Sequence, residues 1–145
     1  MNIFPIINIF ILITISGIHF FWAFGGTWGA DGAIPTNREG KKMLNSWDNF
    51  PSALATLVVA FGLLIMSLLH LEKVQSLSLP IPTWIDIYGL KIIAIIFFIR
   101  AIGEFRYVGF FKKIKETKFA TLDTKYYSPL CILLSFNAFM TAFYL

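Results

Sequence analysis

Four apolar runs, each close to the length of a membrane-spanning helix, constrain this chain more than any other feature. They cover residues 3–24, 52–70, 84–102 and 129–145. The hydrocarbon core of a bilayer needs about 20 apolar residues in helical form. A segment in lipid must also satisfy its own backbone hydrogen bonds, and runs of this length do so as helices. The sequence therefore predicts an all-α, four-helix transmembrane bundle that forms a single integral membrane domain over residues 1–145.

The composition supports the membrane assignment. Hydrophobic residues make up 57% of the 145 residues and include 16 phenylalanines, which is too apolar for a soluble domain of this size. The first run lacks a positively charged n-region and a small-residue cleavage site, so we expect it to be retained rather than removed as a signal peptide. Ser128 and Pro129 form a typical helix start, which predicts that the last helix begins there.

The cationic residues lie unevenly between the two predicted faces. An even number of spans puts both termini on one side with the loop 72–82, and the loops 25–50 and 103–127 on the other. Lys73 is the one cation in the connection on the first side. The long loops carry nine: Arg38, Lys41, Lys42, Arg106, Lys112, Lys113, Lys115, Lys118 and Lys125. The positive-inside bias therefore predicts cytoplasmic loops and termini outside the cell.

The basic loops indicate which partners to expect. The formal net charge of +4 is compatible with nucleic-acid binding, but no motif of a DNA or RNA reader is present. Basic residues beside apolar spans favour membrane lipids with anionic head groups as partners. The tract from Phe105 to Tyr127 alternates lysines with apolar residues, so it either lies along the head-group boundary or forms a solvated loop. The sequence is also compatible with a homo-oligomer or with a protein partner.

Ionisable residues near the inner ends of the predicted helices form a candidate site, because such residues are costly in lipid. At 1.5 Å per residue, His19 and Arg100 reach similar depths near the cytoplasmic interface. Together with nearby loop residues they predict a polar cluster of His19, Arg100, Glu104, Arg106 and Asp123. The alternative is structural: Glu104 follows Arg100 by four residues, a spacing that lets the two pair on one helix face.

Other polar residues in the runs have simpler interpretations. Lys91 either extends its amine outward or donates a hydrogen bond to Asn137 at comparable depth. Cys131 is expected to be a small packing residue. His19 and His70 lie near opposite faces, so they cannot share a metal or haem. We therefore expect no metal site and no cofactor.

Several strings in the chain are unusual in combination. They are HFFWAFGGTWG at 19–29, AIPT at 33–36, RAIGEFRYVGFFKK from 100 and TKFATLDTKYYSPLC up to 131. Together they resemble a family of small bacterial membrane proteins known as domain of unknown function 3995. The resemblance implies a bacterial four-span protein of the cytoplasmic membrane whose motifs lie in the two long loops and the adjoining helix ends. It carries over no reaction and no catalytic residue.

Three functions fit these observations. The first is a non-enzymatic binding or partner module whose inner face holds an anionic group, with Arg100, Arg106 and Asp123 as candidate ligand-binding residues. The second is a small membrane enzyme acting on a lipid-borne anionic substrate, with His19 or Glu104 as general acid or base. The third is a transport subunit that works as an oligomer, since four helices leave little room for a pathway in one chain.

Overall fold

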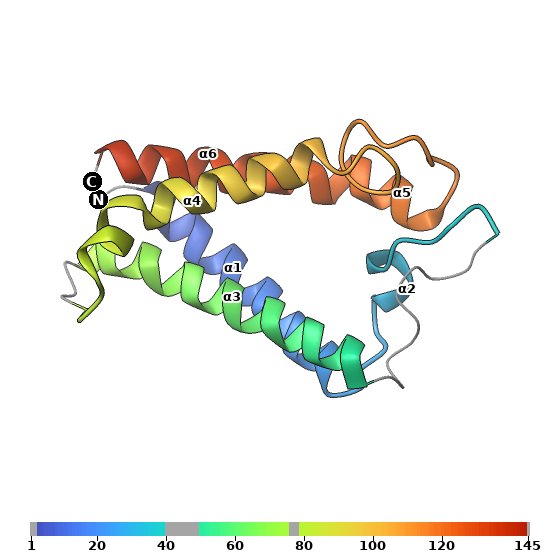
Figure 1. Cartoon of the computed structure of the whole chain (residues 1–145), viewed down its shortest axis with the longest axis horizontal. Coiled ribbons are helices and arrows are strands. Elements are labelled where there is room, and N and C mark those ends of the chain that lie inside the picture. The colour runs from blue at the N-terminus through green and yellow to red at the C-terminus, as the bar shows by residue number, and fades with distance from the viewer. Residues whose placement is uncertain (1–2, 40–49, 76–78, 145) are drawn as a thin grey trace.

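The computed structural model of the chain describes residues 3–39, 50–75 and 79–144 (Figure 1). Two of the basic loop residues, Lys41 and Lys42, and the last residue of the fourth predicted run, Leu145, lie outside these ranges. The described residues form helices and their connections, with no strand. The all-α prediction is therefore confirmed.

Within the described residues, four long helices overlap the four apolar runs, and the second of them extends beyond its run at both ends. They are α1 (Ile3–Ala23), α3 (Phe50–Gln75), α4 (Thr83–Ile102) and α6 (Ser128–Tyr144). Shorter elements lie in the long connections: α2 (Ala30–Ala33), α5 (Lys118–Leu122) and a π-helical turn, η1 (Asp123–Tyr127). The start of α1 and the end of α6 lie at the same end of the molecule, which we call the termini end (Figure 1). The opposite end, with α2 and α5, is the loop end.

Among the residues that the structure describes, three helical stretches are long and apolar enough to cross a membrane. They are Ile3–Ala23, Ala53–Val74 and the continuous helical stretch Lys118–Tyr144. Helix α4 has the necessary length but carries Asp86, Lys91 and Arg100. Large apolar side chains are exposed along every long helix, as expected where lipid rather than water is the surrounding solvent.

Helix α6 begins at Ser128, as predicted, but Ser128 is not an isolated helix start, because a continuous helical path leads into it. The helical path starts at Lys118, where the Thr117 side chain accepts a hydrogen bond from the Ala120 backbone N–H at 3.1 Å, and it continues through η1 into α6. Pro129 would normally break a helix interior because it lacks an N–H and clashes with the carbonyl four residues earlier. The wider π turn, in which the Ser128 N–H donates to the Asp123 carbonyl, accommodates it.

The four long helices form two pairs. Helix α1 packs mainly on α3, and α4 packs mainly on α6; the pairs lie close together at the termini end and diverge toward the loop end (Figure 1). Each pair contains a hydrogen bond from a buried serine to the backbone of its neighbour. Ser16 donates to the Ala60 carbonyl and Ser135 to the Ala94 carbonyl, each at 2.7 Å.

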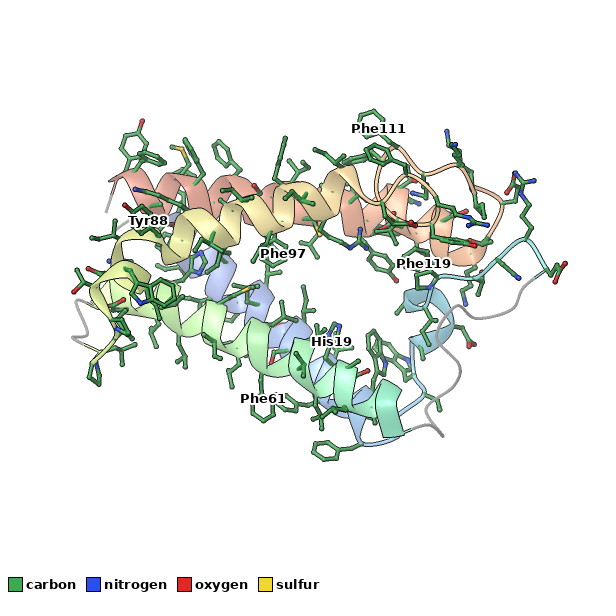
Figure 2. All side chains as sticks on the ribbon, in the orientation of Figure 1. His19, Phe61, Tyr88, Phe97, Phe111 and Phe119 are labelled. Carbon is green, nitrogen blue, oxygen red and sulfur yellow. The ribbon has the colours of Figure 1, made fainter. Side chains whose placement is uncertain are left out.

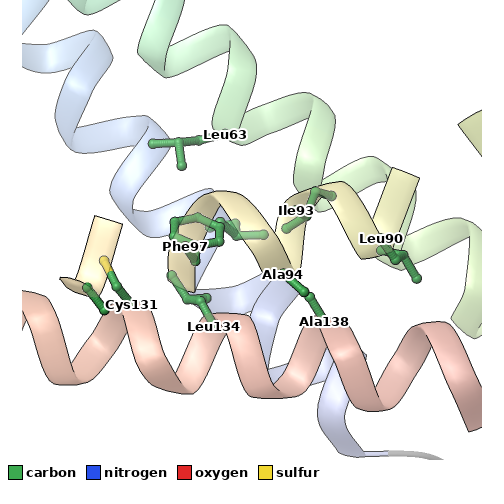
Figure 3. Close-up of a cluster of buried hydrophobic side chains, with 10 residues drawn as sticks. Leu63, Leu90, Ile93, Ala94, Phe97, Cys131, Leu134 and Ala138 are labelled. Atoms are coloured by element: carbon green, nitrogen blue, oxygen red, sulfur yellow. The ribbon is translucent and has the colours of Figure 1, made fainter. Parts of the chain in front are cut away.

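An apolar core holds the two pairs together. Its buried residues come from all four long helices and include Leu12, Leu63, Phe97 and Leu134 (Figure 3). Cys131 is buried in the same cluster, which agrees with its predicted packing role. Packing matters more here than in water, because lipid provides no hydrophobic drive between helices.

A buried polar network joins α1, α3 and α6 near the termini end. The Asn8 amide nitrogen donates to the Leu134 carbonyl at 2.9 Å and to Nε2 of His70 at 3.0 Å. Nδ1 of His70 donates to the Met66 carbonyl at 2.8 Å, which leaves Nε2 as the acceptor of a neutral ring. The Asn8 oxygen accepts from the Asn137 amide at 3.1 Å. All three side chains are at most 2% exposed.

This network corrects the expectation for Lys91. The Asn137 amide nitrogen donates to Asn8, and among the described residues no hydrogen bond joins Asn137 to Lys91. The Lys91 amine instead lies over the rings of Tyr88 and Phe143, at 5.5 and 5.3 Å from their centroids. Aromatic faces attract a cation without requiring it to enter the bundle, which fits the other predicted behaviour, an amine extended outward.

Candidate functional site

Two glycines shape the loop that follows α4. Gly103 and Gly109 have φ values of 83° and 89°, which L side chains rarely adopt. A Cβ on Gly103 would lie 1.8 Å from the Val108 carbonyl oxygen, and one on Gly109 would lie 2.3 Å from that of Ile102. The two backbone segments therefore approach more closely than any other residue would allow. Hydrogen bonds from Phe110 N to Ala101 O and from Ile114 N to Arg106 O hold the loop folded.

Asp123 is the centre of a buried charge network that we call the loop-end triad, consisting of Arg100, Lys112 and Asp123. The carboxylate is fully buried and accepts three hydrogen bonds: from Nη2 of Arg100 at 3.0 Å, from the Gly109 N–H at 2.8 Å and from Nζ of Lys112 at 3.0 Å. Both oxygens are thus occupied by groups of the chain itself. In this arrangement Asp123 holds the loop and Arg100 in place.

Lys112 is a structural residue that the sequence did not reveal. Its side chain is 2% exposed, and its amine also donates to the Gly109 carbonyl at 2.9 Å and to the Thr124 hydroxyl at 2.6 Å. An ammonium group has three protons to donate, so this environment satisfies it completely. From the sequence it was one of several lysines in a basic loop, with no pattern to set it apart.

The predicted pair between Arg100 and Glu104 does not form. Helix α4 ends at Ile102 and the chain turns at Gly103, so Glu104 no longer follows the helical path that would place it beside Arg100. Arg100 is paired with Asp123, while Glu104 is exposed and accepts a hydrogen bond from the Tyr107 N–H. The i,i+4 rule applies only while the helix continues.

The triad contains two cations and one anion, so it carries an excess of one positive charge. The Arg100 side chain is 34% exposed, and its second terminal nitrogen, Nη1, is buried without a hydrogen-bond partner. Burial of unbalanced charge is costly. The loop end is therefore an electropositive region built into the fold.

Beside the triad, the loop end carries an open hollow of about 670 Å³. We call it the cationic hollow, since three basic side chains, Arg38, Arg106 and Lys113, line it. Two acidic side chains, Glu39 and Glu104, and four further residues complete its wall: Asn37, Phe105, Tyr107 and Ile114. The guanidinium of Arg106 lies over the Tyr107 ring at 5.1 Å from the centroid. Arg38 faces Glu116 at 4.0 Å, and both side chains are about two-thirds exposed.

The five predicted site residues therefore separate into three groups. Arg100 and Asp123 belong to the triad, and Glu104 and Arg106 line the cationic hollow. His19 lies in α1, where Nδ1 donates to the Ile15 carbonyl at 2.8 Å and the ring packs edge-on against Trp22. Figure 2 shows it on the α1 side of the molecule, whereas Phe111 marks the loop after α4. Over the described ranges, no group of three potential metal ligands occurs.

Comparison with known proteins places the chain in a family. Residues 12–138 match the family described as "Protein of unknown function (DUF3995)". The chain belongs to this family. The match confirms the resemblance noted from the loop strings. No curated protein and no solved structure matches the chain.

The DUF3995 match includes the complete loop end, with both the triad and the cationic hollow. It also contains His70 and Asn137 but begins after Asn8. The sequence pattern did not single out Asn8 or Lys112 as members of a buried network. The available signal for Asn8 was its position: a carboxamide in the middle of an uninterrupted apolar run has to find a partner from another helix.

Proposed function

We propose that the chain is a multi-pass protein of the bacterial cytoplasmic membrane with both termini outside the cell, and that it is a non-enzymatic module whose loop end binds anionic lipid head groups. The bacterial origin follows the family resemblance. The orientation rests on the excess of cations in the two long loops. The ligand class rests on one observation above all, the open cationic hollow at the end of the bundle.

The position of the cationic hollow favours a membrane-borne ligand. Arg106 lies four residues beyond the end of α4, so its guanidinium is near the level where a helix leaves the hydrocarbon core. Lys113 stands on the same ordered loop. Anionic head groups at a cytoplasmic surface are attracted to such juxtamembrane cations by about 1 kcal/mol per charge.

The enzyme alternative receives less support. His19 and Glu104, the two candidate acid–base residues, belong to different groups, and Nδ1 of His19 is engaged with the backbone of its own helix. General acid–base catalysis needs the group within hydrogen-bond reach of its substrate and partner. A transport pathway needs polar side chains at several depths along one side of the bundle, and the two candidates within the runs, Lys91 and Asn137, share no hydrogen bond in the described residues.

The orientation predicts the result of a reporter experiment. A reporter active only outside the cell, fused after Leu145, should be active, whereas a cytoplasm-active reporter at the same position should be silent. Fusions within the loop 103–117 should give the opposite pattern. Cytoplasmic activity after Leu145 would reverse the proposed topology and place the cationic hollow outside.

Lipid binding is expected to depend on the cationic hollow. Arg106→Gln should weaken binding of phosphatidylglycerol about ten- to hundredfold, since a charge-assisted hydrogen bond contributes roughly 1.5–3 kcal/mol. Native mass spectrometry of the purified protein, titrated with phosphatidylglycerol, measures this. Lys125→Gln is the matched control, because Lys125 is an exposed cation at the same end that lies over the Tyr126 ring and does not line the hollow. Equal losses in both variants would show that binding depends on overall charge and not on this hollow.

A further inference from the structure

The loop after α4 exposes two aromatic side chains and buries the lysine beside them. Phe110 and Phe111, which we call the aromatic tip, are 41% and 65% exposed, whereas the next residue, Lys112, is buried in the loop-end triad. A loop surrounded by water normally does the reverse, since phenylalanine is often fully buried and lysine almost never is. The arrangement is the one expected where the surroundings of the tip are apolar.

The backbone of the aromatic tip lies beside the last turn of α4. The Phe110 N–H donates to the Ala101 carbonyl at 2.9 Å, and Gly109 approaches Ile102 too closely for a Cβ. The loop therefore turns back to the level of the helix end. Figure 2 shows Phe111 beside the pair formed by α4 and α6, on the outer side of the loop and away from the other helix pair.

Asp123 fixes the chain on both sides of the tip. Its carboxylate accepts hydrogen bonds from the Gly109 N–H and from the Lys112 amine, the residues directly before and after the tip. Both flanking residues are thus bound to one buried group. Phe110 and Phe111, between them, are the part of this segment that faces outward.

The tip lies at a level where aromatic side chains meet the membrane interface. Helix α4 packs along α6, which belongs to a stretch long and apolar enough to cross a membrane. Near its end α4 exposes Phe98 and Ile99. In the other pair, Phe24 and Trp28 are exposed just beyond the end of α1. Exposed aromatic residues at helix ends are typical of the boundary between hydrocarbon and head groups.

We propose that the aromatic tip inserts into the bilayer interface, so that the loop after α4 lies against the membrane surface. Phe110 and Phe111 are buried where acyl chains meet head groups, and the exposed cations that follow, Lys113 and Lys115, face anionic head groups. This inference goes beyond the proposed function, because it requires no ligand in the cationic hollow.

A bilayer fits the tip better than a protein partner does. Exposed apolar patches mark either kind of contact. The tip, however, lies beside the last turn of a helix, so a protein that covered it would have to enter the space that lipid fills around α4. Aromatic residues followed by lysines are also the composition of segments that lie on anionic membranes. Contact with protein is one of the outcomes that the experiment distinguishes.

Spin labels measure the surroundings of the tip. Cys131 is the single cysteine, so a Cys131→Ser background allows one label at a time. Labels are placed in the tip at Phe111→Cys and Phe110→Cys, at the exposed loop position Lys115→Cys and at the exposed α4 position Ile99→Cys. Oxygen concentrates in hydrocarbon and a charged nickel chelate stays in water, so relaxation by each reports the medium around the label. The nanodiscs contain phosphatidylcholine alone.

The labels in the tip are expected to resemble the one on α4. The ratio of oxygen to nickel relaxation at positions 110 and 111 should be several-fold higher than at position 115 and should approach that at position 99. Arg106→Gln should leave the ratio at 111 unchanged, because Arg106 lines the cationic hollow. The substituted positions are exposed, so each labelled variant should keep the unfolding midpoint of the Cys131→Ser protein.

The remaining outcomes overturn the proposal. Relaxation mainly by nickel at 110 and 111, as at 115, means that the loop is solvated. Weak relaxation by both reagents means that protein covers the tip. Because these nanodiscs contain no anionic lipid, the result is independent of binding in the cationic hollow, which the phosphatidylglycerol titration tests. Insertion of the tip and head-group binding can therefore fail separately.

Discussion

Asp123→Asn is expected to lower the free energy of unfolding by about 3–5 kcal/mol, the usual cost of breaking a buried ion pair from one side. The substitution keeps the size of the side chain and removes its charge. Lys112 is then a buried ammonium without a counter-charge. Arg100, which is partly buried, also loses its counter-charge. Unfolding in mixed micelles titrated with a denaturing detergent measures the change.

A second substitution shows whether the charge itself is responsible. Lys112→Met combined with Asp123→Asn should recover part of the loss, because the one remaining cation, Arg100, retains access to solvent. Glu104→Gln is the control and should change stability by no more than about 0.5 kcal/mol, as exposed substitutions usually do.

Double-mutant cycles then distinguish the observed pairing from the one the sequence suggested. Arg100→Gln and Asp123→Asn should be strongly non-additive, since the two side chains are hydrogen-bonded. Arg100→Gln and Glu104→Gln should be additive. The opposite pattern would mean that α4 continues as a helix through Gly103 and that the observed loop is wrong.

The long helices could be predicted from the sequence because lipid imposes one strong rule on them. Runs of about 20 apolar residues have to be helical in a bilayer, and turn residues separate the runs. The predicted and observed bounds of α4, for example, differ by one residue. The continuation of helix before Ser128 was missed because η1 is a π turn, and no simple sequence pattern signals an i→i+5 bond.

The candidate site was predictable only in its location. Helix direction and rise placed Arg100 near the loop end, and loop charges pointed to the same end. The partners were not predictable, because they depend on how the backbone turns after Ile102. Gly103 and Gly109 bring Lys112 and Asp123 together from positions 11 residues apart. Local spacing favoured Glu104 instead, a choice that presupposes an unbroken helix.

Asn8→Leu is expected to destabilise the protein by about 2–4 kcal/mol, because it leaves buried groups on two other helices without partners and each such group costs roughly 1–3 kcal/mol. These groups are Nε2 of His70 and the Asn137 amide. A single interhelical hydrogen bond in a membrane contributes on average less than roughly 1–3 kcal/mol. Asn8→Leu removes several such bonds together, so the larger loss is expected. The same detergent titration measures it.

Thr14→Val is the matched control for Asn8. It alters a polar residue of the same helix whose hydroxyl bonds only to the Phe10 carbonyl one turn away, so stability should change little. Asn8→Leu with Asn137→Leu should cost less than Asn8→Leu alone, since replacing both partners by apolar groups removes an unpaired amide. If Asn8→Leu is as stable as Thr14→Val, the network does not join the pairs.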